Sequence, residues 1–141
     1  MSAVIDTNVL VYDTFEDSVF HKEAKVLLDE LDEWLIPSIV VYEYVWLLRE
    51  LEVALNDAVY KVREYLLSPK AKLVFEGPEG ILTSLSLLTR EKLSLSKFND
   101  KLILIVAKRR DCPLFTFDKK LRAQAASLGV PLLPERYPRR G

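Results

Sequence analysis

Short apolar runs alternate along this chain with longer stretches whose apolar residues recur every three or four positions. The short runs are Ala3 to Ile5, Trp34 to Ile36, Lys72 to Phe75, Leu114 to Phe117 and Val130 to Leu133. Runs of this length are typical of buried strands, whereas the longer period indicates helices with one apolar face. Strands that alternate with helices form parallel sheets covered by helices, so we expect an α/β fold with a mainly parallel central sheet.

The helices predicted between these strands begin at capping residues or after chain breaks. Ser18 is expected to cap a helix that extends to Leu31, and Ser38 a helix that extends to about Leu51. Further helices are predicted for residues 56–68, 81–93 and 118–128, and in 81–93 we expect four inward side chains: Leu82, Leu85, Leu88 and Leu93.

The run from Lys101 to Lys108 fits two interpretations. It is apolar between its two lysines, which suits a buried strand as well as a buried helix. We predict a helix, because Asn99-Asp100 makes a good start signal and the next strand follows closely.

Size and composition describe one globular domain. The chain has 141 residues, of which half are hydrophobic and 29% are charged. We assign residues 1–133 to the domain and residues 134–141 to a loose basic tail. No apolar run approaches the ~20 residues that span a bilayer, so we expect a cytoplasmic protein. The few Asn, Gln, Cys and Met residues beside many charges follow the trend of thermophile proteins.

Four acidic residues interrupt or border the apolar segments: Asp6, Glu43, Asp100 and Asp118. Carboxylates are seldom buried without a partner, because removing their charge from water is costly. No basic residue lies within the same apolar runs, so we infer that a metal cation holds the acids together. Carboxylate oxygens favour Mg²⁺ or Mn²⁺, which in turn indicates phosphoryl chemistry.

Each acid also has an ordinary structural explanation. Asp6 and Asp118 suit turns or helix caps, and Asp100 suits a first-turn acid that interacts with the helix dipole. Glu43 fits less well, because it lies inside its helix as the only charged residue between Ile39 and Leu48. That helix is apolar nearly all round, so we expect it to be buried.

Other chemistries lack the residues they need. The four glycines are too scattered for a phosphate-binding loop, and the single histidine, His21, and single cysteine, Cys112, cannot build a zinc site. The Asp6-Thr7-Asn8-Val9 segment is weakly similar to aspartyl-phosphate phosphatases, but Asn8 replaces the second aspartate which that reaction requires.

The ordered motifs make the chain similar to PIN-domain ribonucleases, and specifically to the VapC toxins of toxin–antitoxin pairs. They are Val4-Ile5-Asp6-Thr7-Asn8-Val9-Leu10, Pro37-Ser38 followed by Glu43, Asp100 at the start of the 101–108 run, and Thr116-Phe117-Asp118. Together they cover essentially the whole chain. The resemblance implies a three-layer α/β/α sandwich and endonucleolytic cleavage of single-stranded RNA.

By the same resemblance the four acids form a catalytic quartet that ligates Mg²⁺ or Mn²⁺. Asp6 and Asp100 are the strongest candidates for direct ligands, and Asn8 and Thr116 would orient the carboxylates. Some relatives carry a further acid two residues after the last aspartate, where this chain has Lys120. We therefore favour a site with one metal ion.

The charges are distributed unevenly. Residues 1–60 contain three lysines and arginines against thirteen acids, and residues 61–141 seventeen against eight. A basic half attracts a polyanion such as RNA, although solvated helix faces explain most of these side chains equally well. Among the basic residues near the last two acids (Lys97, Lys101, Lys108, Arg109, Arg110, Lys119, Lys120 and Arg122), we select Lys97 and Lys119 as RNA contacts.

Residues 39–51 and 81–93 offer more apolar surface than one small domain usually hides. Since VapC-like proteins form homodimers, these segments are the predicted interface. The toxin interpretation also implies an antitoxin, similar to VapB, that blocks the acidic pocket with a basic residue.

Two other functions remain open at this point. One is an RNA-processing or quality-control PIN nuclease without an antitoxin, which the neighbouring genes would distinguish. The other is a catalytically silent PIN-like module that binds RNA or protein, against which the intact set of four acids argues.

Overall fold

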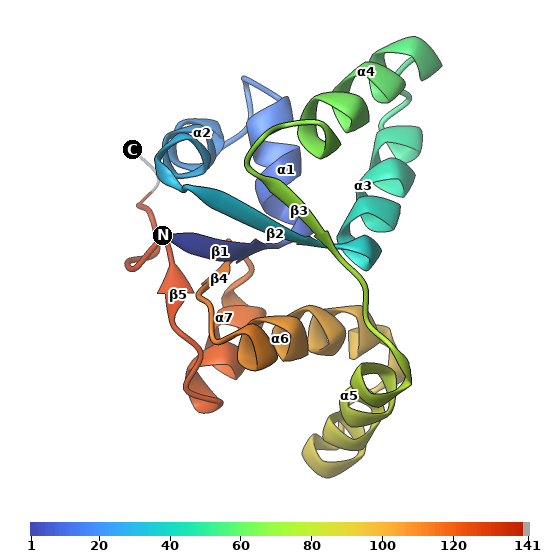
Figure 1. The fold of residues 1–141 in the computed structure, drawn as a ribbon, viewed down its shortest axis with the longest axis vertical. Helices are drawn as coiled ribbons and strands as arrows, with labels where there is room; N and C mark the ends of the chain where they lie inside the picture. The colour runs from blue at the N-terminus through green and yellow to red at the C-terminus, as the bar shows by residue number, and fades with distance from the viewer. Residues whose placement is uncertain (140–141) are drawn as a thin grey trace.

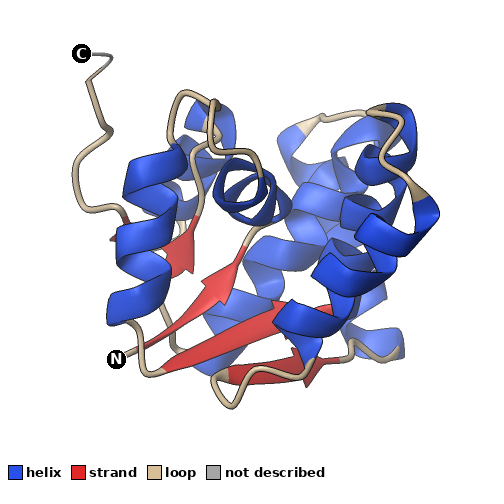
Figure 2. Cartoon of the chain, turned by 90° about the horizontal axis from the view of Figure 1, so that it is seen from above, coloured by secondary structure: helices blue, strands red, loops and turns tan. Residues whose placement is uncertain are grey.

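The computed structural model describes residues 1–139 and contains a five-stranded sheet in which every neighbouring pair is parallel. The strand order is β3-β2-β1-β4-β5. Figure 2 shows the strands fanned into a twisted sheet with helices lying over it. The strands are β1 (Ser2–Ile5), β2 (Glu33–Pro37), β3 (Ala71–Val74), β4 (Leu114–Phe115) and β5 (Leu132–Leu133).

Helices cover both faces of the sheet and make three layers. In Figure 1, α1 to α4 lie above the strands, whereas α6 and α7 lie below them and α5 packs against α6. The α/β/α sandwich predicted from the sequence is therefore confirmed. The helices are α1 (Thr7–Thr14), α2 (His21–Glu30), α3 (Ser38–Glu50), α4 (Leu55–Leu66), α5 (Pro78–Glu91), α6 (Phe98–Arg110) and α7 (Lys119–Ser127), with a 3₁₀ turn, η1 (Leu95–Lys97), before α6. None of the helices in residues 1–139 is long and apolar enough to cross a membrane.

The centre of the sheet fixes where a site can form. Ala3, Val4 and Ile5 of β1 are fully buried, as are both residues of β4. β1 pairs with both β2 and β4, and the chain order along the sheet reverses between β1 and β4. In open parallel sheets, ligands bind beyond the carboxyl ends of the strands at such a reversal.

Several helix starts differ from their predictions. α1 was not predicted, because its residues Thr7–Thr14 are rich in β-branched side chains and too few to show a helical stripe. Ser18 does not cap α2, which begins at His21; its hydroxyl donates instead to the carbonyl of Tyr12. Ser38 is the first residue of α3 rather than its cap. α4 begins at Leu55, one residue before the predicted start.

Two predictions of burial were wrong. α3 is not buried all round, because it packs on α1, α4 and α6 from one side only. Tyr42 and Trp46, on its other side, are 57% and 58% exposed. In α5, Leu82 is exposed, whereas the predicted inward position of Leu88 is confirmed. Leu85 is half-buried, and Leu87, which was not predicted, is buried.

The described part of the predicted loose tail is anchored to the domain. The Arg122 guanidinium donates to the carbonyl of Pro134 at 2.7 Å, and the Tyr137 ring packs edge-on against Phe20. Residues 140–141 lie outside the described part of the chain.

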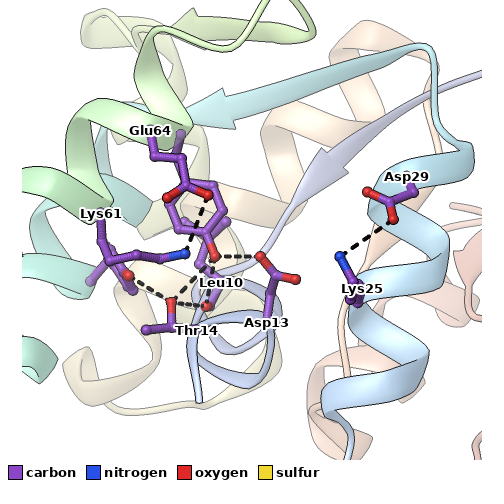
Figure 3. Close-up of polar contacts among 9 residues, drawn as sticks. Leu10, Asp13, Thr14, Lys25, Asp29, Lys61 and Glu64 are labelled. Atoms are coloured by element: carbon purple, nitrogen blue, oxygen red, sulfur yellow. Dashed lines mark hydrogen bonds and ion pairs between the residues drawn. The ribbon is translucent and has the colours of Figure 1, made fainter. Parts of the chain in front are cut away.

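A network of hydroxyl groups ties the carboxyl end of α1 to α3 and α4 (Figure 3). The Thr14 hydroxyl lies 2.7 Å from the Tyr44 hydroxyl and 3.2 Å from that of Tyr65, and it donates to the carbonyl of Leu10 at 2.7 Å. The Tyr65 hydroxyl donates to Asp13 Oδ2 at 2.6 Å. We call Asp13, Thr14, Tyr44 and Tyr65 the hydroxyl network.

Candidate functional site

The four acids selected from the sequence line one cavity of about 270 Å³ beyond the carboxyl ends of β1 and β4. Each comes from a different part of the fold, so only the tertiary structure brings them together. The other lining residues are small, polar or apolar side chains from α1 and α3. We call this space the acidic cavity; its lining consists of Asp6, Thr7, Asn8, Val11, Tyr12, Glu43, Leu47, Asp100 and Asp118.

Asp6 follows β1 directly and begins α1. Its Oδ1 accepts a hydrogen bond from the Thr7 amide at 2.7 Å, which makes Asp6 the N-cap of that helix. Its Oδ2 accepts hydrogen bonds from the Thr116 hydroxyl at 2.6 Å and from Asn8 Nδ2 at 3.2 Å. Asp6 therefore caps α1, as considered from the sequence, and also lines the cavity.

Asn8 and Thr116 connect the first acid to the segment that carries the last one. Asn8 Oδ1 accepts a hydrogen bond from the Phe117 amide at 3.2 Å, and Thr116 Oγ1 accepts one from the Asp118 amide at 3.1 Å. These bonds fix the turn after β4 against the start of α1. Both residues touch Asp6, as the sequence analysis proposed.

Asp118 is the N-cap of α7 and also lines the cavity. Its Oδ1 accepts hydrogen bonds from the amides of Lys120 at 2.9 Å and Leu121 at 3.1 Å. Asp118 thus has the capping role considered from the sequence. These capping bonds also hold its carboxylate at the cavity rim.

Glu43 projects from the second turn of α3 and is held at both carboxylate oxygens. Oε1 accepts a hydrogen bond from the Thr7 hydroxyl at 2.6 Å, and Oε2 accepts one from Asn99 Nδ2 at 3.1 Å. Sequence reasoning missed both partners. Their only signal was position, since Thr7 follows Asp6 and Asn99 precedes Asp100.

Burial and mutual repulsion raise the pKa of two of the acids. Desolvation is the main cause of the raised pKa of Asp6, about 7, and the charges of Asp100 and Glu43 add to it against hydrogen bonds from Thr116 and Thr7. Desolvation also raises the pKa of Asp100, with Asp118 and Glu43 as further causes and Lys97 and Lys101 as opposing ones. Acids that resist ionisation in this way are stabilised by a nearby cation.

The donor set of the cavity fits a hard divalent cation. No three acidic, histidine or cysteine side chains among residues 1–139 are grouped closely enough to enclose a metal ion by themselves. Mg²⁺ does not require such a cage, because it keeps several waters and is commonly held by one or two carboxylates. Asp6 and Asp100 both line the cavity and repel each other, so a cation bound between them would relieve that repulsion.

Two basic residues near the acids bind other groups of the protein and are not available to contact RNA. Lys101 is fully buried, and its Nζ forms an ion pair with Glu91 Oε2 at 2.6 Å, without hydrogen-bond geometry. Arg122 is 9% exposed, and its guanidinium donates to the backbone carbonyls of Thr116, Leu133 and Pro134. Neither side chain can reach a phosphate without leaving these partners.

Lys97 and Lys119 stand at the rim. Lys97 ends η1, immediately before α6, and its charge acts on Asp100. Lys119 is exposed beside Asp118, with its Nζ 4.9 Å from the centroid of the Tyr137 ring. Lys97 is half-buried and Lys119 is exposed, and neither belongs to the lining of the cavity itself.

Comparison with known proteins places the fold. A family model described as the PIN domain matches residues 3–126. No curated protein is detectably similar to the chain in sequence.

Solved structures give the same fold at low identity. The crystal structure of VapC20 from Mycobacterium tuberculosis, described as a toxin that cleaves the sarcin–ricin loop, aligns with a TM-score of 0.76 and 18% identity over 86% of this chain and 94% of that one. A toxin–antitoxin complex from Klebsiella pneumoniae aligns with a TM-score of 0.66 and 21% identity over 96% and 99%. FitAcB from Neisseria gonorrhoeae aligns with a TM-score of 0.62 and 17% identity over 94% and 96%.

Proposed function

The chain belongs to the PIN domain family, and on that premise we propose that it is a metal-dependent endoribonuclease that cleaves single-stranded RNA as a toxin of the VapC type. One observation supports this most strongly: Asp6, Glu43, Asp100 and Asp118 come from four separate elements and line the same cavity at the sheet reversal. A fold that needed these acids only as helix caps would have no reason to gather them.

We propose that Asp6 and Asp100 hold the cation, which is Mg²⁺ or Mn²⁺. When bound, the cation would activate a water molecule and neutralise charge on the scissile phosphate. Thr116 and Asn8 keep Asp6 oriented through their hydrogen bonds to Oδ2. Asp118 keeps its place at the rim through its bonds to the α7 amides and adds negative charge beside Asp100.

The RNA is proposed to approach across the rim, where Lys97 and Lys119 would contact phosphates on either side of the scissile bond. A basic side chain at the rim attracts the backbone without reading sequence, which suits cleavage whose specificity lies elsewhere in the RNA. Because RNA of this kind is found inside the cell, we also propose a cytoplasmic location.

We propose an antitoxin of the VapB kind as a partner, because the structures of similar fold include toxin–antitoxin complexes. A basic side chain of that partner would insert among the carboxylates and relieve the repulsion that raises the pKa of Asp6. The same position would exclude the metal ion and the RNA together.

We further propose a homodimer through residues 39–51 and 81–93. Trp46 of α3 is 58% exposed and Leu82 of α5 is 62% exposed, and Figure 1 shows both helices on the same side of the molecule. Large apolar side chains left in water are typical of a surface that a second copy covers.

The decisive experiment is cleavage of a mixed single-stranded RNA pool by the purified protein and by Asp100→Asn, with Mg²⁺, Mn²⁺ or EDTA. We expect cleavage by the wild type with either metal, none with EDTA, and none by the variant under any condition. Equal cleavage by both proteins would contradict the proposed site. No cleavage by the wild type with either metal, on RNA that includes structured loops, would contradict the proposed activity.

A further inference from the structure

Both carboxylate oxygens of Glu43 are already used within the protein. The Thr7 hydroxyl donates to Oε1 at 2.6 Å, and Asn99 Nδ2 donates to Oε2 at 3.1 Å. Each donor is the sequence neighbour of another cavity acid, Asp6 in one case and Asp100 in the other. Of the four acids, Glu43 is the one whose two oxygens are bound by side chains from two different helices.

We propose that Glu43 acts as a bridge that fixes the distance between Asp6 and Asp100, and that Asn99 and Thr7 are positioning residues of the site. We call the two hydrogen bonds together the Glu43 bridge. The inference rests on the proposed function and deepens it, because it assigns Glu43 to the geometry of the cation site instead of to direct ligation.

The bridge joins helices from opposite faces of the sheet. α1, which begins after Asp6, lies above the sheet in Figure 1, whereas α6, whose first turn carries Asp100, lies below it. Glu43 reaches both from α3. A carboxylate that accepts a hydrogen bond from the start of each helix holds the two starts together, although the acids beside them repel each other.

Direct ligation by Glu43 would compete with these bonds. Asp6 also accepts hydrogen bonds at both oxygens, but its donors do not join α1 to α6. An oxygen of Glu43 that turned to the cation would weaken its bond from Thr7 or Asn99, and with it the link between the two helix starts. Hydrogen-bond partners that orient metal ligands typically contribute 10–100-fold to metal affinity. We expect the bridge to have an effect of this order, because it positions the helix starts beside both proposed ligands.

The test is Mn²⁺ binding by isothermal titration calorimetry, with unfolding in EDTA measured alongside to confirm that each variant folds. Asn99→Ala is expected to weaken Mn²⁺ binding by about 10-fold or more. Asn56→Ala is the matched control, because Asn56 is exposed on α4 and lies outside the cavity lining. Asn99→Ala with wild-type affinity would overturn the proposal.

Glu43 variants separate a bridge from a ligand. In Glu43→Gln, the amide can donate to the Thr7 hydroxyl while its oxygen accepts from Asn99, so both hydrogen bonds survive without the charge. A bridge therefore predicts that Glu43→Gln retains clearly more Mn²⁺ affinity than Glu43→Ala. Equal loss in the two variants would mean that the charge of Glu43 is what the cation requires, and would overturn the proposal.

A double-mutant cycle tests most directly whether Asn99 acts through Glu43. If Asn99 acts only through Glu43, then Asn99→Ala should have no further effect on Mn²⁺ affinity in a Glu43→Ala background. Full additivity of the two losses would contradict the bridge. Wild-type protein that binds no Mn²⁺ at all would instead contradict the proposed function itself, which keeps the two failures distinct.

Discussion

The two ends of α1 carry polar clusters that differ in charge. At its start, Asp6 lies within the acidic cavity and has a pKa raised to about 7 by desolvation and by neighbouring acids. At its end, Thr14 joins the hydroxyl network, in which Tyr44 and Tyr65 supply neutral donors and Asp13 is the only carboxylate. The eight residues of α1 thus connect two different clusters. In the acidic cavity the carboxylates repel one another, whereas in the hydroxyl network each hydroxyl has a hydrogen-bond partner.

The difference shows what each cluster contributes. Satisfied hydroxyl groups in a buried network fix the packing of α1, α3 and α4 without a charge penalty. Closely placed carboxylates destabilise the folded protein until a cation or a basic side chain joins them. We therefore expect removal of the Asp6 charge at the start of α1 to stop the chemistry while it stabilises the fold. Changes at the end of α1 should instead destabilise the fold and leave the chemistry intact.

The largest effect is expected from Asp6→Asn. Removing this charge should lower the rate of RNA cleavage by at least about 1000-fold, because metal-assisted charge neutralisation contributes several kcal/mol to such reactions. Gel assays of single turnovers would measure it. The control is Asp29→Asn, an exposed carboxylate of the Lys25–Asp29 ion pair on α2 in Figure 3, which should cleave at the wild-type rate.

Wild-type cleavage by Asp6→Asn would remove the contrast between the two ends of α1. Loss of cleavage by both Asp6→Asn and Asp29→Asn would point to a general effect of lost charge.

The second largest effect is expected in the pH dependence of the free energy of unfolding, measured in EDTA. The pKa of Asp6 is higher in the folded protein than the usual value of 3.8, so folding favours its protonated form. Its contribution to the free energy of unfolding is therefore intact at acidic pH and falls as the pH rises from about 4 to about 7. The loss amounts to about 4 kcal/mol at pH 8.

Chemical denaturation at several pH values would compare the free energy of unfolding of the wild type with that of Asp6→Asn. The variant should be the more stable protein at pH 8 and should lose that advantage at pH 4. A difference that does not change with pH would show that Asp6 is not a destabilising charge.

At the other end of α1, Tyr65→Phe should lower the free energy of unfolding by about 1–3 kcal/mol, because Asp13 loses the hydroxyl that donates to it. Burial raises the pKa of Tyr65 above its usual range, so this effect should be the same from pH 5 to pH 8. Cleavage per folded molecule should not change. A loss of cleavage greater than the loss of folded protein would mean that the hydroxyl network reaches the site.

Much of this arrangement could be predicted from the sequence, since strand runs and helical periods determine the parallel sheet and place the acids near its carboxyl edge. α1 was missed because Thr7–Thr14 is short and rich in β-branched residues. Asp6 caps this helix, and α2 and α3 pack against it. Local patterns do not contain that tertiary support.

The acids were found because each stands alone among apolar residues, but their partners were not. Thr7 and Asn99 look like ordinary polar residues at helix starts, and only the tertiary structure shows that Glu43 binds both. Lys101 shows the opposite case. From the sequence it was one of the basic residues near the acids that could contact RNA, whereas in the fold it is buried against α5 beside Glu91.

The smallest predicted effect concerns the rim. Lys97→Ala should weaken RNA binding modestly and reduce the slope of log affinity against log salt by about 1, as expected for one phosphate contact. Lys61→Ala is the control, because Lys61 lies on α4 beside the hydroxyl network, with its Nζ 5.0 Å from the centroid of the Tyr65 ring. Equal slopes for both variants and the wild type would remove Lys97 from the proposed RNA path.

Mn²⁺ titration followed by nuclear magnetic resonance tests the central claim most directly, because the paramagnetic ion broadens signals according to their distance from it. The account predicts that amide signals of Thr7, Asn99 and Asp118 disappear first, while those of Thr14 and Tyr65 persist at the same Mn²⁺ concentration. Broadening that spares the first group, or that appears equally at both ends of α1, would contradict a cation site within the acidic cavity.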